Sequence, residues 1–165
     1  MHVLIDADAL PKAAKEVILR VAGRLQNLHW TMFANKRLHR PPHLNIAMVT
    51  VEKNPDEADD YIVEAVQSGD LVITSDVPLA DRVIGKGAFV LGPKGDFFSS
   101  ANIKNRLATR NLLDQLRTEG LVQGGPAPFS EKDAQKFANE LNNFLVKRLR
   151  EETRLAEGQG GHSAK

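Results

Sequence analysis

The chain of 165 residues contains no cysteine. This absence excludes disulfide bonds, thiolate nucleophiles and zinc sites built on sulfur. No apolar run approaches the roughly 20 residues that a membrane-spanning helix needs, so we expect no membrane span. The segment Met1–Asp6 reaches a charged residue too early for a signal peptide. A cytoplasmic bacterial-type protein is therefore expected.

An excess of either charge is also absent. Lys and Arg total 22, Asp and Glu total 21, and the net charge is +1. A nucleic-acid-binding protein with this balance needs local basic patches, because no overall excess attracts phosphate. Hydrophobic residues make up 42% of the chain, which excludes a disordered protein and supports an ordinary packed core.

Short apolar runs, typical of buried parallel strands, alternate with helical patterns up to residue 91. The expected strands cover residues 2–5, 30–34, 46–51, 71–74 and 88–91. The expected helices between them cover residues 11–26, 54–68 and 77–86. This alternation predicts a three-layer α/β fold, in which helices cover both faces of a mostly parallel sheet of about five strands.

Two further helices are expected after the sheet, at 100–118 and 130–155, with a Gly/Pro linker between them. Ser130 and Asp133 have the spacing of a capping box at the start of the last helix. The apolar face of this helix packs against the sheet or against a second subunit, which would make a homodimer. We expect one domain over residues 1–155 and a disordered tail over residues 156–165.

Aspartates follow two of the expected strands. In parallel sheets, ligands bind outside the carboxyl ends of the strands. Asp6 and Asp8 come directly after the first strand, and in an extended chain their side chains point the same way. Asp76 ends the fourth strand. The alternative interpretation is helix capping, by Asp8 at the first helix and by Ser75 or Asp76 at the third.

Asp59 lies one turn into the second expected helix. The residues three, four and seven positions after it are all apolar: Ile62, Val63 and Val66. This spacing places Asp59 in line with the buried stripe, where a carboxylate is unfavourable unless it is paired or bound to a metal. Asp81, one turn beyond Asp76, is an outer candidate.

Carboxylates crowded at one edge repel each other, and a hard divalent cation removes that penalty. Mg²⁺ or Mn²⁺ takes such oxygen ligands and keeps waters for chemistry. The pattern therefore predicts metal-assisted hydrolysis of a phosphodiester. The candidate metal ligands are Asp6, Asp8, Asp59, Asp76 and Asp81, of which the first four are also candidate catalytic residues.

The loop after the second strand carries the best basic patch for RNA phosphates. A turn-forming Asn35 and an ordinary solvated loop are the alternative interpretation. The candidate substrate-binding residues are Asn35, Lys36, Arg37, Arg40 and Ser75.

Several segments resemble the YaiI/YqxD family of uncharacterised bacterial proteins. They are Asp6-Ala7-Asp8-Ala9-x-Pro11, Ala34-Asn35, Ala58-Asp59, the stretch 69–80, Lys86-Gly87-Ala88 and Gly124-Gly125-Pro126. The resemblance covers nearly the whole chain up to the tail. One departure is Leu10, where the family usually has a cysteine, so a thiol there is dispensable or has been lost.

The family is similar to the PIN/NYN-like nuclease fold, in which acidic residues at strand ends bind Mg²⁺ or Mn²⁺ and cut RNA. That similarity implies that Asp6, Asp59 and Asp76 occupy the acidic positions, and it extends less specifically to Asp8 and Asp81. Two other interpretations stay open. One is a non-catalytic module that keeps the fold and binds RNA or a protein at the same edge. The other makes the aspartates purely structural, as caps and paired charges.

Overall fold

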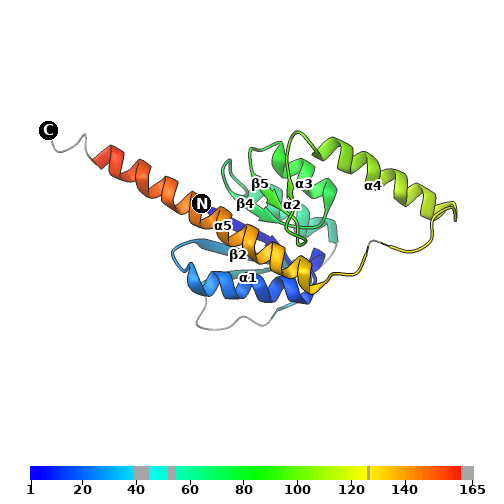
Figure 1. The fold of residues 1–165 in the computed structure, drawn as a ribbon, viewed down its shortest axis with the longest axis horizontal. Helices are drawn as coiled ribbons and strands as arrows, with labels where there is room; N and C mark the ends of the chain where they lie inside the picture. Colours follow the sequence, from blue (N-terminus) through cyan, green and yellow to red (C-terminus); the bar gives the residue numbers. More distant parts are fainter. Residues whose placement is uncertain (39–44, 52–54, 126, 161–165) are drawn as a thin grey trace.

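The computed structural model describes residues 1–38, 45–51, 55–125 and 127–160. Within these residues six strands form one sheet in the order β3-β2-β1-β4-β5-β6 (Figure 1). The strands are β1 His2–Asp6, β2 His29–Ala34, β3 Ile46–Thr50, β4 Leu71–Ile73, β5 Phe89–Leu91 and β6 Phe97–Phe98. The helices are the 3-10 turn η1 Ala7–Ala9, then α1 Lys12–Arg24, α2 Pro55–Ala65, α3 Val77–Ile84, α4 Ile103–Thr118 and α5 Glu131–Gly160.

The predicted α/β class and the mostly parallel sheet are confirmed. Strands β1 to β5 pair in parallel, and β6 pairs antiparallel with β5. The sequence did not predict β6, because a strand of two residues is too short to show a periodicity. A tight turn at Gly95, whose φ of 86° suits glycine, separates β6 from β5.

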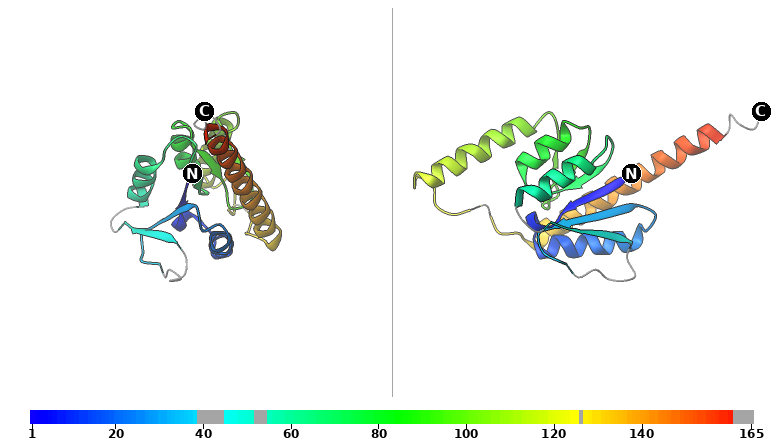
Figure 2. Two further views of the ribbon diagram at one scale, coloured as in Figure 1. Left: turned by 90° about the vertical axis from the view of Figure 1, so that its left-hand side faces the viewer. Right: turned by 180° about the vertical axis from the view of Figure 1, so that it is seen from behind.

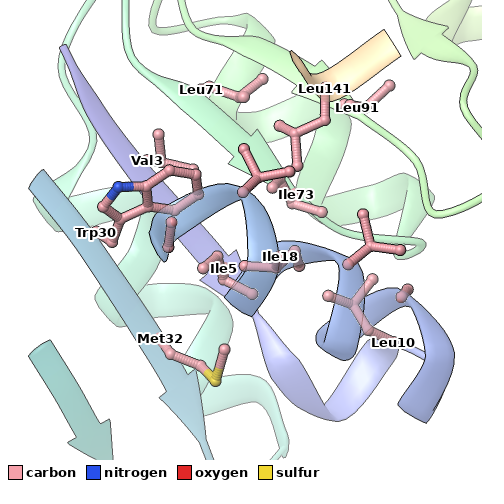
Figure 3. Packing of buried hydrophobic residues seen from close by; sticks show 14 of the residues in the cluster. Val3, Ile5, Leu10, Ile18, Trp30, Met32, Leu71, Ile73, Leu91 and Leu141 are labelled. Atoms are coloured by element: carbon pink, nitrogen blue, oxygen red, sulfur yellow. The ribbon is translucent and has the colours of Figure 1, made fainter. Parts of the chain in front are cut away.

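Helices cover both faces of the sheet because successive strand residues point to opposite sides. Val3 and Ile5 of β1 join the apolar cluster under α1 and α5, whereas Leu4 joins the cluster under α2 and α3. Figure 2 shows the sheet between α2 on one side and α1 with α5 on the other. Figure 3 shows the first cluster, where Ile18 of α1 and Leu141 of α5 pack with the strand residues.

The long helix α5 packs within its own chain. Phe137, Leu141 and Leu145 are fully buried in the cluster with α1, which confirms the first of the two expected packing partners. The capping box is also confirmed. The Asp133 N–H donates to Ser130 Oγ over 3.1 Å, and the Ser130 N–H donates to Asp133 Oδ2 over 3.0 Å.

Helix α5 is longer than predicted. It was expected to end near Leu155, before a disordered tail, but it continues through Gly160. Ala156 and Glu157 are good helix formers, and Gly158 costs only about 1 kcal/mol in the helix interior, while Gly160 is the last helical residue. Residues 161–165 lie outside the described residues.

Other element boundaries differ from prediction by a few residues. Helix α1 begins after Pro11, α4 begins at Ile103 rather than near residue 100, and α2 ends at Ala65 rather than near Ser68. The expected start of the second helix at residue 54 lies outside the described residues. None of the helices in the described ranges is long and apolar enough to cross a membrane.

Candidate functional site

Asp6 is a buried carboxylate at the carboxyl edge of the sheet. It is the last residue of β1 and only 4% exposed. Its Oδ2 accepts a hydrogen bond of 2.8 Å from Thr74 Oγ1, directly after the adjacent strand β4. Burial raises the pKa of Asp6 to about 6, against the lowering effect of the Thr74 hydrogen bond. The negative charges of Asp76 and Asp8 raise this pKa further, so three carboxylates act on one another here.

Thr74 connects the two central acidic residues. Its fully buried hydroxyl donates to Asp6 and also accepts the backbone N–H of Asp76 over 2.9 Å. Sequence reasoning did not single out this residue, because a threonine at a strand end is common. Only its place in the segment that resembles the family marked it.

Asp76 caps α3, as the capping interpretation predicted. Its Oδ1 accepts the N–H of Leu79 over 3.1 Å, and the helix has proline in its first turn. Ser75 does not take this role, because its hydroxyl donates to the carbonyl of Ala9. This bond joins the end of β4 to η1.

The backbone after β1 is not extended, so the prediction that Asp6 and Asp8 point the same way was wrong. Residues Ala7–Ala9 form a 3-10 turn, closed by the Leu10 N–H on the Ala7 carbonyl, and this turn leaves Asp8 exposed while Asp6 is buried. The capping interpretation of Asp8 was also wrong, since Pro11 is the cap residue of α1. Asp8 Oδ2 instead accepts the backbone N–H of Asn35 over 2.6 Å.

Asn35 brings the end of β2 to the same edge. Its side-chain Oδ1 is buried and has no hydrogen-bond partner among the residues that the structure describes. A buried acceptor of this kind calls for a donor from a water or a ligand. Asp6, Asp8, Asn35, Thr74 and Asp76 together are called the carboxyl-edge site below.

Asp59 is half-buried rather than fully inward. The buried residues of α2 are Ala58 and Ile62, with Val66 just beyond, while Asp59 lies beside this stripe. The prediction that Asp59 lies in line with the buried stripe is met in part, since Ile62 and Val66 are buried as expected and Asp59 is half-buried. As α2 follows the parallel strand β3, its first turn begins at the carboxyl edge of the sheet.

Asp81 binds a lysine on the neighbouring helix. Its Oδ1 lies 2.9 Å from Lys104 Nζ, which ties α3 to α4. Among the candidate substrate-binding residues, Lys36 and Arg37 are exposed directly after β2, and Ser75 is exposed at the edge. Arg40 lies outside the described residues.

Metal coordination was the central expectation from the sequence. Across residues 1–38, 45–51, 55–125 and 127–160, no three or more His, Asp or Glu side chains are grouped so that they could hold one ion. The described acids therefore do not form an all-protein metal cage. Mg²⁺ commonly needs less, because it is often bound through one or two carboxylates together with waters and substrate phosphates. The hard oxygens of Asp6 and Asp76 fit that second type of site.

Comparison with known proteins identifies the family. The model of the family described as "Uncharacterized BCR, YaiI/YqxD family" matches residues 4–147. The chain belongs to the YaiI/YqxD family. A UPF0178 protein of Burkholderia lata is 48% identical over 147 residues, which cover 89% of this chain and 97% of the relative. One from Trichlorobacter lovleyi is 46% identical over 151 residues, which cover 92% and 97%.

No solved structure matches this YaiI/YqxD chain. The matched region includes every residue of the carboxyl-edge site. It also includes Leu10, the position at which the resemblance described above implies a cysteine in the family. Leu10 is only 7% exposed and packs in the cluster with α1 and α5 (Figure 3), so this position serves the core of the protein.

Proposed function

We propose that this protein hydrolyses phosphodiester bonds in RNA with the help of Mg²⁺ or Mn²⁺. The observation that supports this proposal best is the buried Asp6 carboxylate, which lies close enough to Asp76 and Asp8 for their charges to raise its pKa. A bound cation would offset this repulsion. Burial of a charge without such compensation is costly, and proteins concentrate perturbed carboxylates at functional sites.

Asp6 and Asp76 would hold the ion, and Asp59, one turn into α2, is a further proposed ligand with Asp81 outside it. The ion would activate a water and stabilise the leaving oxygen. Thr74 would keep the Asp6 carboxylate in place, since its hydroxyl already donates to Oδ2. Asp8 would orient the water, and the buried Asn35 Oδ1 would accept a hydrogen bond from it. Lys36, Arg37 and Arg40 would contact the phosphates.

Calorimetric titration of Mn²⁺ and Mg²⁺ tests the proposal, with and without a phosphorothioate RNA that resists cleavage. We expect saturable binding to the wild type, stronger with the RNA because its phosphates complete the coordination. Asp76→Asn should abolish it, and asparagine still caps a helix, so the fold is kept. Asp60→Asn is the matched control, because Asp60 is an exposed acid of α2 paired with Arg82.

Absence of binding in both conditions would contradict the metal-dependent reaction. Binding that survives in Asp76→Asn would place the ion elsewhere. If binding is found, cleavage of unmodified RNA should require the metal and stop when a chelator is added.

A non-catalytic binding module is the second candidate. It is favoured by the fact that Asp6, Asp8 and Asp76 each already accept a hydrogen bond from the protein. This candidate predicts RNA affinity that persists in chelator, weakens with salt, and leads to no cleavage under any metal condition.

A further inference from the structure

Helix α4 is covered by the rest of the protein over only a small part of its surface. Ile103 is its single buried residue, and Leu112 is 55% exposed. The helix leaves the body next to α3 and extends away from the sheet (Figures 1 and 2). In its first turn Lys104 forms an ion pair with Asp81 of α3.

A groove of about 540 Å³ runs along this helix. Its apolar lining comes from Val77 of α3, Phe98 of β6 and Leu113 of α4. Its charged lining comes from Arg106, Arg110 and Arg117, all on α4. These six residues define the α4 groove.

The charge of the α4 groove is strongly positive in a nearly neutral protein. Helix α4 carries Lys104 and three arginines against one acid, Asp114, while the whole chain has a net charge of +1. Asp114 lies 3.7 Å from Arg110 and 3.1 Å from Arg117. Exposed pairs of this kind contribute little, so a phosphate can replace Asp114 as the partner.

The spacing of the arginines places them on one side of the helix. Arg110 follows Arg106 by four residues, and Arg117 follows Arg110 by seven. These separations correspond to about one and about two helical turns. The positions lie about 6 Å and about 10.5 Å apart along the axis. The guanidinium of Arg106 also lies 4.9 Å from the centre of the Phe98 ring, which holds that side chain over the groove.

We propose that the α4 groove binds a single strand of RNA and leads it to the carboxyl-edge site, which rests on the proposed function for the identity of the polymer. The phosphates contact Arg106, Arg110 and Arg117, and the bases lie against the apolar lining. Single strands expose base faces that a duplex hides, so an apolar floor with a cationic side selects them. Val77 follows Asp76 directly in the chain, so the groove and the carboxyl-edge site adjoin.

Fluorescence anisotropy with a short fluorescein-labelled single-stranded RNA tests this inference, in chelator so that no metal takes part. We expect Arg106→Gln with Arg110→Gln to weaken binding about tenfold. The slope of log affinity against log salt should fall by about 1.4, since each phosphate contact on a single strand contributes about 0.7. Arg110→Gln alone should weaken binding in the same direction and leave the contact between Arg106 and Phe98 in place.

The matched control is Arg150→Gln with Arg154→Gln. These exposed residues of α5 have the same four-residue spacing and remove the same charge. If the α4 double variant and the α5 double variant weaken RNA binding equally, the inference is overturned. Tighter binding of a duplex than of a single strand, or no RNA binding by the wild type, would overturn it as well.

Cleavage assays with Mn²⁺ separate this inference from the proposed function. If RNA binds through Arg106 and Arg110 but is never cut, the inference about the groove stands and the proposed hydrolysis is wrong. If the wild type and the Arg106→Gln, Arg110→Gln variant cut RNA equally well at low RNA concentration, the proposed hydrolysis stands and the inference about the groove is wrong.

Discussion

The charged side chains of the carboxyl-edge site and those of the α4 groove differ in how firmly the protein holds them. Asp6 is buried and hydrogen-bonded to Thr74, and Asp76 is fixed as the cap of α3. The arginines of α4 are exposed on a helix that leaves the body. Changes at the first region should therefore alter stability, whereas changes at the second should alter binding with little effect on stability.

The largest effect is expected from Thr74→Val. This change removes the hydroxyl that donates to Asp6 and accepts from the Asp76 N–H, so two polar groups lose their partner. We expect a loss of about 3 kcal/mol in the free energy of unfolding, measured with urea at neutral pH. Thr74→Ser keeps the hydroxyl and should lose only about 1 kcal/mol. Equal losses in the two variants would assign the effect to packing.

Asp6→Asn should act in the opposite direction and stabilise the protein at neutral pH. The folded state raises the pKa of Asp6 from 3.8 to about 6 and so favours its protonated form. The contribution of the Asp6 carboxyl group to the free energy of unfolding of the wild type is therefore fully present below pH 3.8, and it is lost as the pH rises to about 6. The asparagine variant does not titrate, so its advantage should be near zero at about pH 4 and reach about 2 kcal/mol at about pH 7.

Urea unfolding of both proteins across this pH range measures the difference. Asp60→Asn is again the control, since it makes the same substitution at an exposed acid of α2. An advantage that does not change with pH would mean that Asp6 is not the group that titrates.

Asp76 should show a smaller effect, because it is half-buried and its structural role is one hydrogen bond to Leu79. Asp76→Ala should lower the free energy of unfolding by about 1 kcal/mol, as for other lost helix caps. Asp76→Asn retains a cap and should stay within about 0.5 kcal/mol of the wild type in thermal unfolding. If both variants are equally destabilised, the negative charge rather than the cap supports α3.

The carboxyl-edge site could be predicted in outline from the sequence. Buried apolar runs identified β1 and β4, and parallel pairing of these strands brings Asp6 and Asp76 to one edge. The 3-10 turn that separates Asp6 from Asp8 could not be predicted, because three residues show no periodicity. The hydroxyl of Thr74 was missed for a similar reason, since its role depends on which strand lies beside β4.

The α4 groove was harder to predict. The sequence shows that 100–118 is helical but not which of its sides the body covers, and basic loop residues 36–40 were a stronger local signal. Only the packing of α4 beside Val77 and Phe98 reveals that its arginines line a groove. Exposure of a helix is a tertiary property, whereas the position of a strand end is largely a local one.

The smallest stability effect is expected from Arg110→Gln, which separates the two regions most clearly. Arginine and glutamine have similar helix propensities, and the exposed pair with Asp114 at 3.7 Å contributes little. Thermal unfolding should therefore change by less than about 0.5 kcal/mol, while RNA affinity in chelator falls. A clear loss of stability would mean that the arginines hold α4 in place, and the contrast between a fixed acidic edge and a free basic groove would not stand.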